Sequence, residues 1–184
     1  MNTSINVQGL HHVAHRCKDA QTTVDFYSSL LDLECTLGVA ENRVPSTGEF
    51  SPHIHVVFKM GDGLYLAFLE LAQSPHMALD ANTPDWVQYL ALRVDRMEKL
   101  VGYKERLEAA GLEAVGPVEH KICQSICFFD PDGQPMELTL ATSTPALDAK
   151  LYEMSGPLLR EWNRTKRAPE FGFMHDHLAS ERGK

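Results

Sequence analysis

The stretch HHVAHRCKDAQTTVDFYSSLLDL, residues 11–33, changes its apolar period once, from that of a strand to that of a helix. Residues 10–17 read as a short strand, and the residues after them have apolar side chains at a helical spacing, at Val24, Tyr27, Leu30 and Leu31. Asp19 is a good N-cap, because its carboxylate can accept a hydrogen bond from a free backbone N–H. We therefore predict a strand that leads directly into a helix.

Two further strands follow this helix in the sequence. They are HIHVVFKM and LYLAFLELA, and the residues Gly61, Asp62 and Gly63 between them are typical of a hairpin turn. The segment 41–52 is rich in turn residues and is predicted to be a loop. A first unit of strand, helix and about three strands thus spans residues 8–73.

The same order recurs after a linker-like segment, residues 74–85. A strand over 86–94 precedes a helix over 96–111, closed by a C-cap glycine, and further strands and a Pro-Asp-Gly turn complete a second unit, 85–141. HVAHRC (12–17) lies over YLALRV (89–94). We expect an α+β fold in which two βαβββ modules form a curved mixed sheet cup within one domain, 1–143, followed by a helical extension, 144–184.

Strand alternation assigns the polar side chains to the face of each sheet that the helix does not cover. In the second unit Leu90, Leu92 and Val94 form the apolar face under the helix, and Tyr89, Ala91 and Arg93 face the other way. Transferred to the first unit, this puts His12, Ala14 and Arg16 on the inner, concave face, and we expect His11 and His15 to point away from it. His53, His55, Glu137 and Thr139 are separated from apolar neighbours by the same alternation.

Charge and composition exclude some classes of function. The net charge of −8 makes nucleic acid an unexpected partner, and no apolar run is long enough to cross a membrane, so a cytoplasmic location is expected. The four cysteines are predicted to be reduced thiols. The tail has apolar residues at helical spacing, interrupted at Gly156-Pro157, and this face should dock on its own sheet or on a second subunit, which predicts a homodimer.

Two motifs resemble those of the vicinal oxygen chelate superfamily, which includes glyoxalase I, bleomycin and fosfomycin resistance proteins and extradiol dioxygenases. They are the opening stretch, with its His-Val strand and Phe-Tyr helix, and SICFFDPDGQPMEL, with an Asp-Pro-Asp-Gly turn before a Glu-Leu strand. The resemblance implies a divalent metal inside a cup, with ligands on the first and last strands of each unit. Carried over residue by residue, these positions are His12, Tyr89, Glu137 and Glu70.

The resemblance favours a metal-dependent dioxygenase or lyase. The preferred function is Fe(II)-dependent extradiol cleavage of a small aromatic substrate, with His55 or His53 as acid and base and His120 as a histidine beside the metal ligands. Arg16 and Arg93, with Tyr89, would contact the substrate, which would be acidic unless the arginines pair with internal glutamates. The alternatives are a glyoxalase-like lyase or isomerase using Ni, Zn or Mn, with Glu70 as a fourth ligand and base, and a metal-free small-molecule-binding protein.

Overall fold

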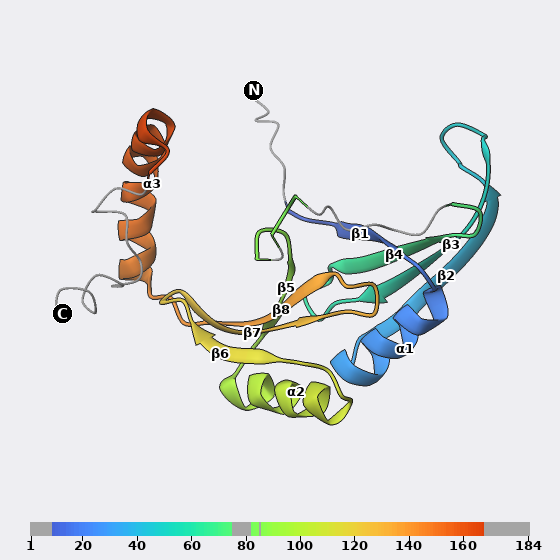
Figure 1. Ribbon diagram of the computed structural model, residues 1–184, viewed down its shortest axis with the longest axis horizontal. Coiled ribbons are helices and arrows are strands. Elements are labelled where there is room, and N and C mark those ends of the chain that lie inside the picture. Colours follow the sequence, from blue (N-terminus) through green and yellow to red (C-terminus); the bar gives the residue numbers. More distant parts are fainter. Residues whose placement is uncertain (1–8, 75–81, 85, 168–184) are drawn as a thin grey trace, which may run out of the picture. The chain divides into compact units, whose positions relative to one another are not determined.

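The computed structural model of the chain describes residues 9–74, 82–84 and 86–167, and Figure 1 shows its elements. They separate into two compact units, Met1–Gln88 with Phe129–Gln134, and Tyr89–Phe128 with Pro135–Lys184. Each unit contains one helix and one four-stranded sheet, and a further helix follows the second sheet. The α+β fold of two βαβββ modules with a helical extension is therefore confirmed.

The first unit contains β1 (His12–Cys17), α1 (Ala20–Leu31), β2 (Glu34–Arg43), β3 (Phe50–Lys59) and β4 (Tyr65–Leu71). The strand order is β1-β4-β3-β2, with β1 parallel to β4 and the other pairs antiparallel. Helix α1 begins as predicted, because the Asp19 carboxylate accepts a hydrogen bond from the backbone N–H of Thr22. It ends at Asp32, which has a left-handed conformation.

The second unit repeats this topology with β5 (Leu90–Val94), α2 (Met97–Ala109), β6 (Val115–Glu119), β7 (Cys123–Phe129) and β8 (Pro135–Ala141). Its strand order is β5-β8-β7-β6, and β5 runs parallel to β8. Gly111 closes α2 with φ of +82°, and its N–H donates to the Glu108 carbonyl, as expected of a C-cap glycine. Met136 and Leu138 are buried, as the alternation along β8 predicts.

The core of the first unit gathers around Tyr27 of α1. Its ring contacts those of Phe58 and Phe68, with centroids 5.4 and 4.8 Å away. The Tyr27 hydroxyl is buried and donates a 3.0 Å hydrogen bond to Asp130, in the Asp-Pro-Asp-Gly turn. Asp130 also accepts from the backbone N–H groups of Asp132 and Gln134. The two motifs that suggested the family are therefore joined by one buried hydrogen bond.

Some predicted boundaries are wrong. The loop is limited to residues 44–49, because β2 and β3 extend through most of the segment 41–52 as paired strands. The strand predicted over 86–94 begins only at Leu90, and residues 86–88 form a turn. Most of the linker-like segment 74–85 and the last seventeen residues, 168–184, lie outside the described part of the chain.

The described part of the extension, residues 144–167, contains the helix α3 (Pro145–Thr165), which continues through Pro157 instead of breaking there. Thr144 caps its first turn by accepting from the Leu147 N–H. None of the residues of α3 is buried. In the part of the chain that the structure describes, no helix has the length and apolar character needed to traverse a bilayer.

Candidate functional site

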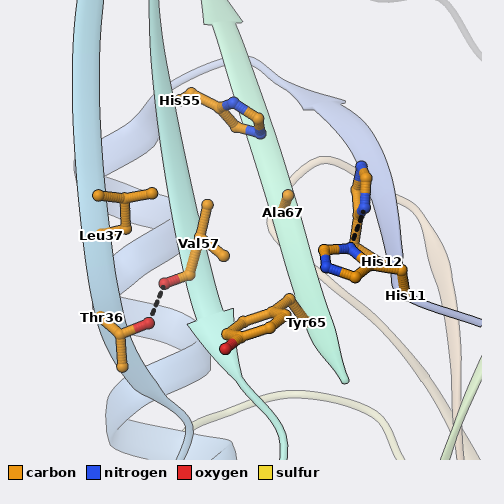
Figure 2. A pocket seen from close by; sticks show the side chains of 8 residues that line it. All are labelled: His11, His12, Thr36, Leu37, His55, Val57, Tyr65 and Ala67. Atoms are coloured by element: carbon orange, nitrogen blue, oxygen red, sulfur yellow. Dashed lines mark hydrogen bonds between the residues drawn. The ribbon is translucent and has the colours of Figure 1, made fainter. Parts of the chain in front are cut away.

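A cavity of about 410 Å³ opens on the face of the first sheet that is opposite α1. Figure 2 shows its side chains, which come from the start of β1 and from β2, β3 and β4. Val57 and Ala67 form an apolar floor, with His55 beyond one end of it and Tyr65 at the other. The full lining is His11, His12, Thr36, Leu37, His55, Val57, Tyr65 and Ala67.

The two adjacent histidines of the cavity contact each other. The Nδ1 atoms of His11 and His12 lie 2.8 Å apart, so one ring donates a hydrogen bond to the other, and both Nε2 atoms are left for other partners. The expectation that His11 points away from His12 is wrong. Strand alternation does not extend to His11, because β1 begins only at His12. His15 does lie on the helix side, with its ring 6.2 Å from that of Phe68.

The two candidate acid–base histidines lie in different surroundings. His55 lines the same cavity as His12, and its Nε2 atom is buried without a hydrogen-bond partner among the described residues. His53 contacts the carbonyl oxygen of Ser51 through Nδ1, at 2.7 Å, and lines a separate cavity of about 360 Å³ together with Glu70. Of the two histidines, His55 is therefore the one that shares a cavity with the predicted ligand His12.

Glu70 lies on the helix side of the first sheet, away from the cavity that His12 and His55 line. Its register partner on β1 is the buried Cys17, and its Oε2 accepts a 2.7 Å hydrogen bond from the backbone N–H of Ala20, at the first turn of α1. A carboxylate at this place complements the positive end of the helix dipole. The placement of Glu70 accounts for its charge without a metal.

The strand register identifies the position that corresponds to Glu137 in the first unit. Glu137 pairs with Ala91, and Ala91 corresponds to Ala14, which pairs with Ala67. The carboxylate of the second unit is therefore replaced in the first unit by the methyl group of Ala67, on the cavity floor. The sequence comparison had placed Glu70 at this position, which the register corrects.

Glu137 forms a polar cluster within the second unit. It is buried, and its Oε1 lies 3.9 Å from Nε2 of His120, which is also 3.1 Å from the Ser125 hydroxyl. Burial, and after it the negative charge of Glu137, raises the pKa of the Cys123 and Cys127 thiols. The predicted neighbour of the metal ligands, His120, thus lies next to Glu137, while the thiols stay protonated at neutral pH.

The remaining predicted residues lie on the expected strands or beside them. Tyr89 immediately precedes β5 and is half exposed, and Arg93 is an exposed residue of β5. Arg16, the fifth residue of β1, is partly buried, and it is not among the described residues that line the cavity. Their roles in binding an acidic substrate stay predictions.

The donor types of the site suit a divalent transition metal. Imidazole and carboxylate groups bind Fe(II), Mn(II) and Zn(II), and His12 keeps its Nε2 atom for such a contact. Within the ranges that the structure describes, no three His, Cys, Asp or Glu side chains form a metal-binding group. The ligand roles of His12, Tyr89, Glu137 and Glu70 therefore stay predictions from the sequence.

Sequence reasoning missed several residues of the cavity. Tyr65 lies beside the histidines, its ring centroid 5.9 Å from that of His11, because β4 pairs in parallel with β1 and matches Tyr65 to His12. Thr36 and Leu37 come from β2, a strand that was not predicted individually. Parallel pairing of the first and last strands of each unit was the signal that could have identified Tyr65.

Comparisons with known proteins identify relatives of this arrangement. The family model of the glyoxalase/bleomycin resistance protein/dioxygenase superfamily matches residues 9–138. A curated protein of Bacillus subtilis (strain 168) named "Putative ring-cleaving dioxygenase MhqA" is 28% identical over 140 residues, which are 73% of this chain and 41% of that protein. The chain thus spans about two fifths of the length of this relative.

Solved structures share the fold at lower identity. A glyoxylase/bleomycin resistance protein/dioxygenase domain from Frankia sp. EAN1pec has a TM-score of 0.61 at 20% identity, covering 74% of this chain and 99% of that domain. The fosfomycin resistance protein FosX of Listeria monocytogenes, solved with Mn(II) and sulfate, has a TM-score of 0.54 at 22% identity, covering 74% of this chain and 95% of FosX. Both show the same fold.

Proposed function

Since this chain belongs to the glyoxalase/bleomycin resistance protein/dioxygenase superfamily, we propose that it is a metal-dependent enzyme of that superfamily, an extradiol-type dioxygenase that uses Fe(II) to open a small aromatic ring. The observation that carries this proposal is the cavity that joins His12 and His55 over a floor containing Ala67. The relative from Bacillus subtilis, named "Putative ring-cleaving dioxygenase MhqA", supports the same reaction class.

The replacement of a carboxylate by Ala67 favours a three-ligand set over a four-ligand set. The glyoxalase-like alternative requires a fourth ligand that also acts as the base, and Glu70 was its candidate. Because Glu70 accepts a hydrogen bond at the start of α1 on the other face of the sheet, the proposal leaves it out of the metal site. His12, Glu137 and Tyr89 remain the proposed ligands.

The proposed reaction breaks the ring carbon–carbon bond next to two vicinal hydroxyls and adds both atoms of O₂ to the product. A divalent metal, when bound, would lower the pKa of the substrate hydroxyls and hold both oxygens. His55 is suited to accept the hydroxyl proton and to return it later, because imidazole titrates near neutral pH and its Nε2 has no other partner among the described residues. The aromatic ring would lie on Val57 and Ala67.

Metal analysis followed by oxygen uptake tests the proposal. The protein is purified without added metal, its metal content is measured, and it is then loaded with Fe(II) without oxygen and mixed with catechols. We expect one O₂ consumed per ring opened, and loss of both metal and uptake in His12→Ala, with the urea midpoint confirming that the variant is folded. Metal-free protein that neither binds Fe(II) nor consumes O₂ would refute the dioxygenase and favour a metal-free binding protein.

A further inference from the structure

None of the described residues that line the cavity of the first unit has a formally charged side chain. Its eight lining residues contribute three imidazoles, one phenol, one threonine hydroxyl and the apolar groups of Leu37, Val57 and Ala67. The neighbouring cavity beside β3 differs, because Glu41 and Glu70 both line it. The cation nearest in sequence to the ligand His12, Arg16, is not part of the lining of the first cavity.

We propose that the substrate group that lies against this wall is uncharged and apolar, so that the substrate is an alkyl- or halogen-substituted vicinal diphenol and not a carboxylated one. This inference rests on the proposed function for the diphenol and adds its substituent. It replaces, for this side of the site, the acidic substrate that Arg16 suggested from the sequence.

The physical argument is one of desolvation. Among the described lining residues a carboxylate substituent would find no lysine or arginine, so it would lose its hydration without gaining an ion pair to such a side chain, which disfavours its binding. An alkyl group on the same floor is removed from water against Val57, Ala67 and Leu37, and each buried methylene strengthens binding about fourfold. The difference in binding free energy between the two substituents therefore favours the ring with the neutral substituent.

Ala67 determines how large that substituent can be. The residue lies on the floor, 1% exposed, next to the larger side chains of Val57 and Tyr65. A longer side chain at this position would occupy the space above the floor, on the side that faces His12 and His55. Leu37, at the rim, is half exposed and can accept a charged replacement without burying it.

Calorimetry on the full chain tests this inference without relying on turnover. The protein is loaded with Zn(II), which has no redox chemistry, and titrated with 4-tert-butylcatechol, catechol and 3,4-dihydroxybenzoate. We expect the butyl compound to bind at least tenfold more tightly than the carboxylate. Ala67→Leu should weaken the butyl compound at least tenfold and catechol less than threefold. Leu37→Arg should reverse the order, whereas Leu159→Arg, the same substitution on exposed α3, should leave it unchanged.

The outcomes separate this inference from the proposed function. Equal or tighter binding of the carboxylate, or no binding of any of the three compounds, overturns the inference. Oxygen uptake by the Fe(II) protein without a preference among the compounds leaves the dioxygenase and removes the neutral substituent. The expected preference without any oxygen uptake supports the neutral aromatic ligand and refutes the dioxygenase.

Discussion

Removing the hydroxyl of Tyr27 tests the contact between the helix motif and the Asp-Pro-Asp-Gly turn. In Tyr27→Phe the ring remains packed between Phe58 and Phe68, and the 3.0 Å hydrogen bond to Asp130 is lost. A hydrogen bond to a charged group contributes about 1.5–3 kcal/mol, and Asp130 keeps the bonds from the Asp132 and Gln134 N–H groups. We expect the free energy of unfolding to fall by about 2 kcal/mol.

Urea unfolding at neutral pH, followed by circular dichroism, measures this loss. The matched control is Tyr152→Phe, because Tyr152 lies on α3 with 83% of its surface exposed and its hydroxyl is hydrated in the folded and unfolded protein alike. The control should change the free energy of unfolding by less than about 0.5 kcal/mol. If Tyr27→Phe lost no more than the control, the hydrogen bond would not stabilise the unit and the reasoning would be refuted.

The pH dependence of the same variant gives an independent check. Burial raises the pKa of the Asp130 carboxyl above its ordinary value of 3.8, while the Tyr27 hydroxyl acts in the opposite direction by bonding to the charged form. As the pH falls through the pKa of Asp130, the carboxyl becomes neutral and the bond weakens to about 1 kcal/mol. The difference between wild type and Tyr27→Phe should therefore be largest at neutral pH and shrink in acid.

Three further predictions concern other residues of the first unit. Glu70→Gln keeps an acceptor for the first turn of α1 and should lower the free energy of unfolding by at most about 1 kcal/mol, with metal content unchanged in elemental analysis; loss of the metal would restore Glu70 as a ligand. Burial raises the pKa of the Cys17 thiol from 9.0 to about 11, so the thiol ionises at lower pH in the unfolded chain than in the folded one. The free energy of unfolding, measured with urea, should therefore fall by about 3 kcal/mol between pH 9 and 11. An equal loss in Cys17→Ala would contradict this. His55→Ala should slow oxygen uptake by about 10²–10⁴-fold, and His53→Ala by less than tenfold; the reverse order would identify His53 as the base.

The fold was predictable because its signals are local and occur twice. The spacing of apolar residues changes from that of a strand to that of a helix once in each unit, at Asp19 in the first. The N-cap, the Gly61-Asp62-Gly63 turn and the C-cap glycine all occur where they were expected. Strand β2 was missed because its sequence, ECTLGVAENR, has few β-branched residues and weak alternation. Its pairing with β3, which the sequence does not encode locally, determines its extent.

The candidate site was less predictable, because strand alternation gives the face of a residue but not its partner on the next strand. Alternation placed His12 and His55 correctly on the face opposite α1, where both line the cavity. It could not show that Ala67 corresponds to Glu137 or that Glu70 lies on the side of α1. The first fact follows from the registers of β4 on β1 and of β8 on β5, and the second from the register of β4 on β1. His11 was misplaced for a related reason, because a residue before the strand does not obey its alternation.

The register also shows how far the two modules have diverged at equivalent positions. His12 begins the first strand of one unit and Tyr89 immediately precedes the first strand of the other, while the last strands present Ala67 and Glu137. Each module thus keeps one strong metal donor, an imidazole or a carboxylate, and has a phenol or a methyl group in place of the second.

The folding of the first unit depends on a turn that lies late in the sequence. The first unit includes Phe129–Gln134 from the hairpin between β7 and β8, and Asp130 in that hairpin accepts the hydrogen bond of the buried Tyr27 hydroxyl. Asp132 in the same turn accepts a 3.0 Å hydrogen bond from the backbone N–H of Lys18, between β1 and α1. A buried hydroxyl without a partner costs about 1–3 kcal/mol, so the first module lacks part of its own stabilisation without the second. The Asp-Pro-Asp-Gly turn therefore contributes to the stability of the first unit.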